Sequence, residues 1–404
     1  KEVTNMIILN GKYSDAKIFT NNCESEAQSQ IIELLNQPFA ENCNARFMPD
    51  VHAGKGCTVG TTMLIDNKVC PNLVGIDIGC GVEVYKIKET ELDLEKLDNM
   101  LQENIKVPYG FSKRNFPHEF SNLTRLKELR CFEHIDYNNA MLSLGSLGGG
   151  NHFIEVNRDS NDNIYLVIHS GSRHLGIEVC KYYQSIAEKN TINLKSEISK
   201  AIETLKAEGR QSEIEETIKR IKENVIEIPK DLRYIEGQDL LDYLHDMNIT
   251  AEYASLSRQA MADEIMKYMN WTEVEHFSSI HNYIDVENKI IRKGTISAVE
   301  GKKLIIPISM RDGSIIGVGK GNADWNYSAP HGAGRVLSRG KAKEVLTVEE
   351  FKESMKGIYT TCVGQSTLDE SPMAYKTLDE IQTAIVDTVD IIDVIRPIYN
   401  FKAN

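Results

Sequence analysis

The chain has 404 residues, of which 41% are hydrophobic and 26% charged, so it can bury a substantial core. We find no run of about 18 apolar residues that would span a membrane, and the N-terminal residues lack the apolar segment of a secretory signal. Eight scattered cysteines without a CxxC pair favour a reducing, cytoplasmic location over a disulfide framework. The net charge of −13 argues against binding phosphates by general attraction alone, so a nucleic-acid site would need local positive charge.

The order of patterns along the chain predicts an α+β fold. Residues 1–150 read as strands and short helices interrupted by Gly and Asn, and residues 164–169 read as a strand that ends at a histidine. The segment 194–228 has apolar residues at helical spacing in two groups, separated by Gly209 and closed by Pro229, which predicts a hairpin of two amphipathic helices.

A third helix is predicted over 246–269, and residues 285–320 return to strand-like runs. We see no internal repeat and no linker of low complexity. The sequence therefore predicts one domain over residues 1–404, with a helical insertion at about 190–270.

The stretch PNLVGIDIGCGVEV, residues 71–84, contains the first unusual pair. Asp77 and Cys80 lie three residues apart among glycines, between two apolar runs, where neither a core strand nor a disulfide needs them. Four histidines also lie where an apolar or glycine-rich segment meets polar residues: His152, His169, His281 and His331. Each of these alone is more often structural than functional, but together they form a candidate transition-metal site for Mn, Fe or Zn, in which a thiolate can bridge two ions.

Arginines follow two of these histidines at regular distances. Arg173 comes four residues after His169, and Arg335 and Arg339 come four and eight residues after His331. Small residues beside arginines let backbone N–H groups and guanidinium groups approach phosphate oxygens together. A solvated turn is the alternative interpretation of each arginine.

The chain resembles the RtcB RNA-splicing ligases along nearly its whole length. The resemblance rests on ten ordered motifs: MPDVHAGKG (48–56), VGIDIGCGVEV (74–84), GGGNHFIEV (148–156), HSGSRHLG (169–176), HNYI (281–284), SMRDGS (309–314), GKGN (319–322), APHGAGRVLSRG (329–340), ESPMAYK (370–376) and RPIYNFK (396–402). It implies a single large domain of the family's own α+β type, with mixed sheets around a metal cleft.

The resemblance assigns roles to these residues. It implies that two manganese ions are bound by Asp77, Cys80, His152, His169 and His281, with the sulfur of Cys80 shared by both ions. It also implies that His331 attacks the α-phosphate of GTP and carries GMP. The positions matching GTP-binding residues are Asn151, Glu155, Ser309, Ser314, Tyr375 and Lys402, and those matching RNA-phosphate contacts are Arg173, Arg335 and Arg339. Asp50 and His52 match positions near the site, but the resemblance gives them no step.

The implied reaction joins a 2′,3′-cyclic phosphate or 3′-phosphate RNA end to a 5′-hydroxyl end, with GTP, through a histidine–GMP intermediate and an activated RNA 3′ end. We expect no membrane partner and a monomer or weak dimer; the need for an activating protein and the choice between tRNA splicing and RNA repair are open. Two other interpretations are a metal-dependent RNA-end phosphoesterase without ligation and a non-catalytic RNA-binding protein. The chain departs from its relatives at ISMRD (308–312) and at Ser257, which precedes Arg258.

Overall fold

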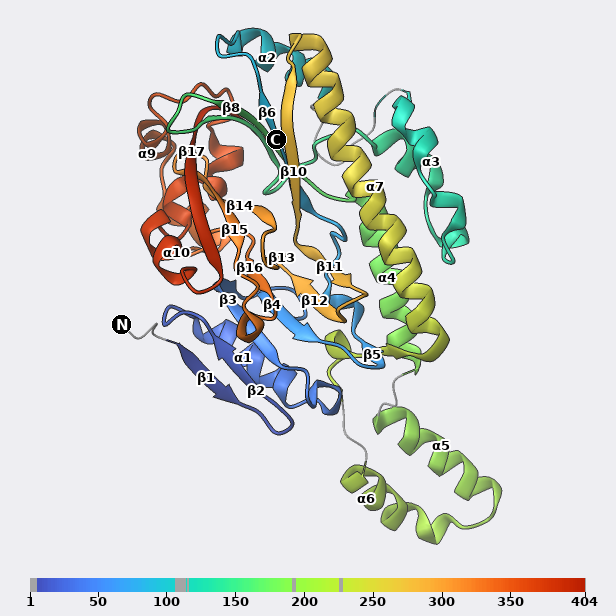
Figure 1. Ribbon diagram of the computed structural model, residues 1–404. Coiled ribbons are helices and arrows are strands. Elements are labelled where there is room, and N and C mark those ends of the chain that lie inside the picture. The colour runs from blue at the N-terminus through green and yellow to red at the C-terminus, as the bar shows by residue number, and fades with distance from the viewer. Residues whose placement is uncertain (1–5, 106–113, 115, 191–193, 225–227, 404) are drawn as a thin grey trace.

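The computed structural model describes residues 6–105, 114, 116–190, 194–224 and 228–403 (Figure 1). One layer is a six-stranded sheet in which only the pairing of β2 with β3 is parallel. Its strands, in spatial order, are β1 (Ile7–Asn10), β2 (Asp15–Ile18), β3 (Ala45–His52), β4 (Val59–Leu64), β12 (Ile290–Lys293) and β11 (Asn282–Asp285). Helix α1 (Ser25–Leu35) packs against β1, β2 and β3 through Ile31, Leu34 and Leu35.

A second sheet has seven strands, all paired antiparallel. In spatial order they are β10 (Glu273–Ile280), β6 (Gly81–Ile87), β8 (Ile164–Ser170), β7 (Phe153–Arg158), β17 (Val389–Phe401), β15 (Gly313–Gly319) and β14 (Lys303–Ser309). The two edge strands approach one another, because Lys303 of β14 forms an ion pair with Glu275 of β10 at 2.7 Å. Two short pairs complete the strands: β13 (Thr295–Ser297) with β16 (Ser328–Pro330), and β5 (Lys68–Val69) with β9 (Ile235–Glu236).

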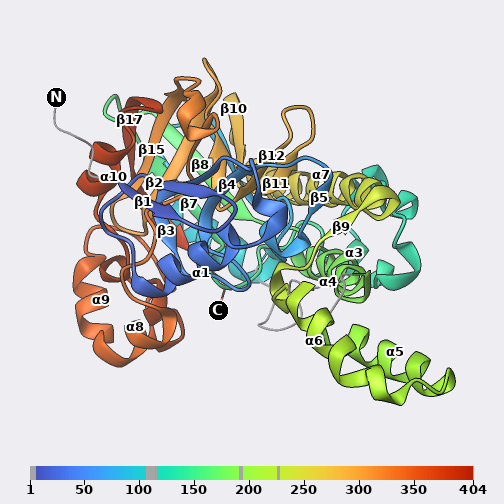
Figure 2. The same ribbon diagram turned by 90° about the horizontal axis from the view of Figure 1, so that it is seen from below.

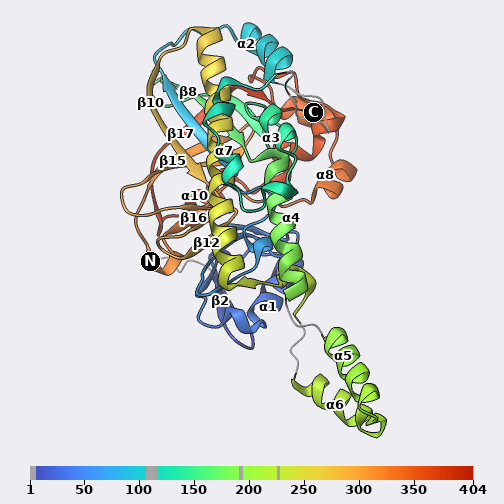
Figure 3. The ribbon, with the colours of Figure 1, turned by 90° about the vertical axis from the view of Figure 1, so that its right-hand side faces the viewer.

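The long helix α7 (Gly237–Met269) links the two sheets, since it packs on β6 and β8 of one sheet and on β11 of the other. It runs along one side of the molecule beside α4 (Arg173–Asn190) (Figures 1 and 3). Its sequence contains no proline, and it ends where Asn270 takes a left-handed conformation with φ of 55°. The remaining helices of the body are α2 (Leu94–Met100), α3 (Tyr137–Ser143), α8 (Arg339–Val345), α9 (Val348–Ser354) and α10 (Leu378–Ala384).

The predicted hairpin is confirmed as α5 (Leu194–Ala207) and α6 (Ile214–Asn224), which stand apart from the sheets (Figures 2 and 3). Gly209 lies between them with φ of 74°, a conformation that favours glycine. The third predicted helix exists, but it begins earlier, at Gly237, because the buried face of α7 already includes Leu240 and Tyr243.

The strands expected at 164–169 and within 285–320 are present as β8 and as β12 to β15. The observed combination of helices with one mixed and one antiparallel sheet agrees with the predicted α+β class. The extent of the domain and the insertion at about 190–270 stay predictions. Among the described helices, none combines the length and apolar composition needed to cross a bilayer.

Candidate active site

The loop that carries Asp77 and Cys80 leads directly into β6, and the backbone N–H of Gly79 within it donates to the carbonyl of Asn282 on β11 at 2.8 Å. The backbone N–H of Cys80 donates to the carbonyl of Asp77 at 3.2 Å, which closes a tight turn. Gly79, with φ of 72°, packs so closely on α7 that an added Cβ would lie 2.5 Å from the Cα of Ala251. The glycines of this motif therefore let the loop press against the helix and direct the side chain of Cys80 into the interior.

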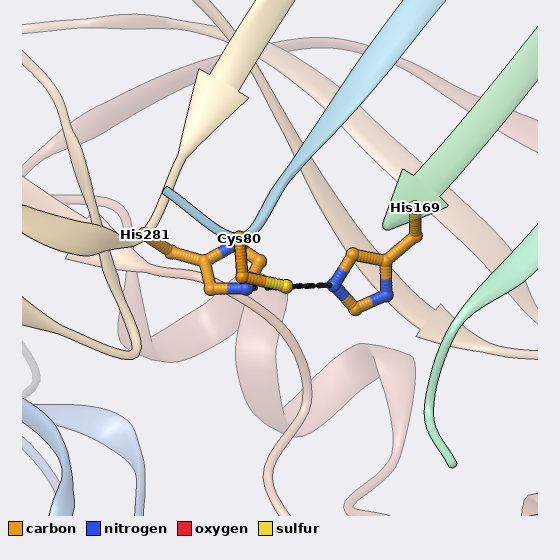
Figure 4. Close-up of side chains that lie close together, drawn as sticks. All are labelled: Cys80, His169 and His281. Carbon is orange, nitrogen blue, oxygen red and sulfur yellow. Dashed lines mark hydrogen bonds between the residues drawn. The ribbon is translucent and has the colours of Figure 1, made fainter. Parts of the chain in front are cut away.

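Three histidines have a ring nitrogen close to the sulfur of Cys80. His152 precedes β7, His169 lies near the end of β8, and His281 lies between β10 and β11. The Cys80 Sγ atom is 3.6 Å from His152 Nε2 and 3.3 Å from His169 Nε2, and the Nε2 atoms of His169 and His281 are 3.4 Å apart. Figure 4 shows Cys80, His169 and His281 pointing toward one another from three separate segments.

The donor atoms form two groups that share one residue. Cys80, His169 and His281 make one group, and Asp77, Cys80 and His152 make the other; within each group all ligand atoms lie within 4.8 Å of one another. The Oδ2 atom of Asp77 is 3.1 Å from His152 Nε2. An added Cβ at Gly171 would lie 2.0 Å from Asp77 Oδ1, so a glycine is needed beside this carboxylate.

The chemistry of these side chains fits bound transition-metal ions. The Nδ1 atoms of His152 and His169 lie 3.1 Å from the carbonyls of Leu147 and Asn151, so each Nδ1 donates a hydrogen; in a neutral ring this leaves the lone pair on Nε2, the atom that faces Cys80. The thiol of Cys80 has a single hydrogen, so it cannot donate to the Nε2 atoms of both His152 and His169. Burial lowers the pKa of His169 and His281 well below the usual value, which keeps both rings neutral as metal binding requires. Sulfur, imidazole and carboxylate ligands together suit Mn, Fe or Zn.

A cavity adjoins this cluster. Its lining includes His52 and Glu370 and nine of the residues singled out from the sequence: Asn151, Glu155, His169, Ser309, His331, Arg335, Arg339, Tyr375 and Lys402. Ser314 is fully buried on β15 and is not among the lining residues. Arg173 is not among them either; it begins α4, and its guanidinium lies where a side chain at Gly148 would otherwise be.

His331 follows β16, and its ring centroid lies 4.8 Å from that of His281. The Oδ2 atom of Asp50 accepts three hydrogen bonds: from His331 Nδ1 at 2.7 Å and from the backbone N–H groups of His331 at 3.1 Å and Gly332 at 3.3 Å. In the neutral ring this contact places the proton on Nδ1 and leaves the lone pair on Nε2. Asp50 is fully buried. This pairing is the arrangement in which a carboxylate orients a nucleophilic or basic histidine.

Glu155 lies on β7 and lines the cavity. Its carboxylate accepts hydrogen bonds from Asn400 Nδ2 at 2.6 Å and Asn157 Nδ2 at 3.3 Å. Burial nevertheless raises the pKa of Glu155 to about 7, so this carboxyl group changes charge near neutral pH.

Four predicted cavity residues converge on Glu370, which the sequence analysis did not assign. Glu370 Oε2 accepts from Tyr375 Oη at 2.7 Å and from Lys402 Nζ at 3.2 Å, while Oε1 accepts from Arg335 and Arg339. Burial opposes ionisation of Glu370, but the positive charges of these neighbours outweigh it and lower its pKa to about 2. The available signal was its place at the start of the ESPMAYK motif.

The structure locates the two places where the sequence departs from the family motifs, Ser257 and residues 308–312. Ser257 is fully buried on α7, and its hydroxyl accepts the backbone N–H of Gly145 at 3.0 Å, in the segment that leads to His152. Asp312 lies in the turn between β14 and β15, where it accepts the hydroxyl of the cavity residue Ser309 at 2.7 Å.

The family model described as "tRNA-splicing ligase RtcB" matches residues 30–403. The chain is 30% identical to the RNA-splicing ligase RtcB of Escherichia coli strain K12, over 94% of both chains. It is 26% identical to the tRNA-splicing ligase RtcB of Methanococcus maripaludis, over 91% of this chain and 89% of the relative. The corresponding protein of Aeropyrum pernix is 26% identical, over 83% of this chain and 82% of the relative. The chain therefore belongs to the RtcB family of RNA-splicing ligases.

Proposed function

We propose that this protein is a GTP- and Mn²⁺-dependent RNA ligase that joins a 2′,3′-cyclic phosphate or 3′-phosphate RNA end to a 5′-hydroxyl end. Membership of the RtcB family supports RNA ligation as the activity. The observation that carries the finer proposal is His331, which lines the cavity beside the Cys80 cluster and is oriented by Asp50.

In the first step, His331 Nε2 forms a bond to the α-phosphorus of GTP and the bond from that phosphorus to the pyrophosphate oxygen breaks. In the neutral ring Nε2 carries the lone pair, so that form can attack without first losing a proton. The imidazole becomes positively charged as the phosphoramidate forms, and the Asp50 carboxylate 2.7 Å from Nδ1 stabilises that charge.

Two sets of cavity-lining groups could recognise the nucleotide. The ionised carboxylate of Glu155 can accept the N1–H and N2–H hydrogens of guanine, and no other base offers that pair of donors. Arg335, Arg339 and Lys402 supply positive charge for phosphate oxygens and are arranged around Glu370. This local charge would let a chain whose net charge is −13 bind phosphate.

Asp77, Cys80, His152, His169 and His281 would hold two manganese ions, with Cys80 common to both groups. When bound, the ions supply positive charge that neutralises and orients phosphate oxygens.

In the second step the 3′-phosphate of RNA attacks the His331-bound GMP, which breaks the N–P bond and forms a phosphoanhydride. In the third step the 5′-hydroxyl attacks the RNA phosphorus, loses its proton and releases GMP; a cyclic phosphate is first hydrolysed to a 3′-phosphate.

Labelling with GTP tests this proposal. The purified protein is incubated with [α-³²P]GTP and MnCl₂, and the acid-labile adduct is located by peptide mapping. We expect label on His331, none in His331→Ala, and normal labelling in His276→Ala, which removes an exposed histidine on β10. An adduct on another residue, or a labelled His331→Ala protein, would contradict the assignment.

One observation favours a second candidate, an RNA-end phosphoesterase: both groups of metal-binding atoms are complete without His331. Such an enzyme would open cyclic phosphates without GTP, and it would need neither Glu155 nor the Asp50–His331 pair. Opening of cyclic phosphates by a protein that never joins ends in the presence of GTP would favour this candidate. A cytoplasmic location, a monomer or weak dimer and any activating partner stay predictions.

A further inference from the structure

Arg258 lies next to the candidate metal cluster of Asp77, Cys80, His152, His169 and His281, but it is not one of the candidate ligands. It is on α7, its side chain is fully buried, and its Nη1 atom donates to two backbone carbonyls, of Gly79 and of Ser170, each at 2.9 Å. Gly79 immediately precedes Cys80, and Ser170 immediately follows His169. One guanidinium nitrogen therefore ties together the two chain segments from which the thiol and an imidazole project.

A buried carboxylate completes the arrangement. Glu83 on β6 is 2% exposed, and its Oε1 atom lies 3.4 Å from Arg258 Nε and 3.3 Å from the hydroxyl of Ser255. Strands β6 and β8 pair directly here, with Gly81 opposite Ser170. Gly81 and Ser170 are the last paired residues of β6 and β8 at this end. Arg258 therefore bridges the two strands at the point where they leave the sheet toward Cys80 and His169.

Stability alone does not account for this residue. A buried arginine–glutamate pair loses its hydration, and an apolar pair of similar volume often serves a fold equally well or better. The planar guanidinium has a property that an apolar side chain lacks, since its N–H groups fix two acceptors at a defined separation. The carbonyls that Arg258 binds belong to Gly79 and Ser170, the neighbours of Cys80 and His169 in the chain. The distance between Cys80 Sγ and His169 Nε2 therefore depends on where these two segments lie.

We propose that Arg258 is a positioning residue for the metal centre: it sets the separation of Cys80 and His169 through the Gly79 and Ser170 carbonyls. This inference rests on the proposed function, because it requires that the cluster binds metal. Groups that orient metal ligands typically change metal affinity by about 10- to 100-fold when they are removed.

The test measures Co²⁺ binding, which reports on the site without any turnover. Co²⁺ is titrated into the metal-free full-length protein, and the thiolate-to-cobalt charge-transfer absorption is recorded together with the thermal unfolding midpoint. The variant is the double substitution Arg258→Gln with Glu83→Gln, which leaves no unpaired buried charge. The matched control is Arg292→Gln with Asp285→Asn, which removes another buried arginine paired to a carboxylate at 3.3 Å.

We expect the Arg258 variant to bind Co²⁺ about 10- to 100-fold more weakly and with an altered charge-transfer band, while the Arg292 control keeps wild-type affinity and band. Equal affinity in the wild type and the Arg258 variant would overturn the inference and leave the proposed function intact. A wild-type protein that shows no thiolate band would overturn both. If the double variant does not fold, Glu83→Gln alone is measured: it frees the guanidinium on one side and should weaken Co²⁺ binding, and unchanged affinity would overturn the inference.

Discussion

Replacing Asp50 with asparagine tests the chemical role of the carboxylate beside His331. Asp50 Oδ2 accepts hydrogen bonds from the His331 ring at 2.7 Å and from two backbone N–H groups. An asparagine has the same shape, and its amide oxygen can still accept those bonds. The substitution therefore removes mainly the negative charge, in a fully buried position where water does not screen it.

The expected magnitude follows from the geometry of this pair. When His331 Nε2 bonds to phosphorus, the ring becomes positively charged beside the carboxylate. Two unit charges about 4 Å apart attract by about 4 kcal/mol at an effective dielectric constant of about 20. Since about 1.36 kcal/mol corresponds to a tenfold change in rate, Asp50→Asn should slow formation of the His331–GMP adduct by about a thousandfold.

The assay is single-turnover labelling with [α-³²P]GTP at saturating MnCl₂. Asp98→Asn is the matched control, because Asp98 is a buried aspartate that binds Thr361 and Tyr399 and is not among the cavity-lining residues. We expect wild-type labelling in the control. A labelling rate for Asp50→Asn within about tenfold of the wild type, or an equal loss in the control, would refute the reasoning.

Three further predictions follow from the same site. Cys80→Ala should abolish Mn²⁺ loading measured by elemental analysis while Cys23→Ala leaves it unchanged, because Cys80 belongs to both groups of metal-binding atoms; normal loading of Cys80→Ala would contradict this. Guanosine, which has no phosphate to titrate, should bind about tenfold more weakly at pH 6 than at pH 8, because Glu155 with its pKa of about 7 is mostly protonated at pH 6. Glu155→Gln should show a flat profile, and a flat wild-type profile would count against Glu155 as the guanine acceptor. Glu370→Gln should lower the free energy of unfolding at pH 7 by about 3 kcal/mol, because the pKa of about 2 in the folded protein lies below the ordinary value of 4.5. In denaturant titrations that difference should shrink as the pH falls from about 4.5 toward 2, and equal stabilities at pH 7 would contradict it.

Periodicity and motif spacing predicted much of the local structure. Apolar spacing predicted α5 and α6, and the run IYLVIH predicted β8, because amphipathic and buried segments carry their pattern in neighbouring residues. The start of α7 at Gly237 was missed, since its first turns are anchored by contacts with β5, β9 and α4 that no local pattern records.

The site was less predictable because its contacts join distant segments. Asp50 and His331 are 281 positions apart in the sequence, so nothing near either residue signals their hydrogen bond. Glu370 was missed for the same reason, because its partners include Lys402, 32 positions away. Motif spacing also gives no orientation: Ser314, predicted to contact the nucleotide, is fully buried on β15 and is not among the cavity-lining residues, so its role stays a prediction.

The proposed ligase activity can be measured as the joining of RNA molecules with defined ends. Labelled RNA with a 2′,3′-cyclic phosphate or 3′-phosphate is incubated with 5′-hydroxyl RNA, GTP and MnCl₂, beside a matched pair with 3′-hydroxyl and 5′-phosphate ends. We expect that the wild-type protein joins only the first pair, that omission of GTP stops joining, and that His331→Ala joins neither pair. Joining of 5′-phosphate ends, or joining by His331→Ala, would contradict it.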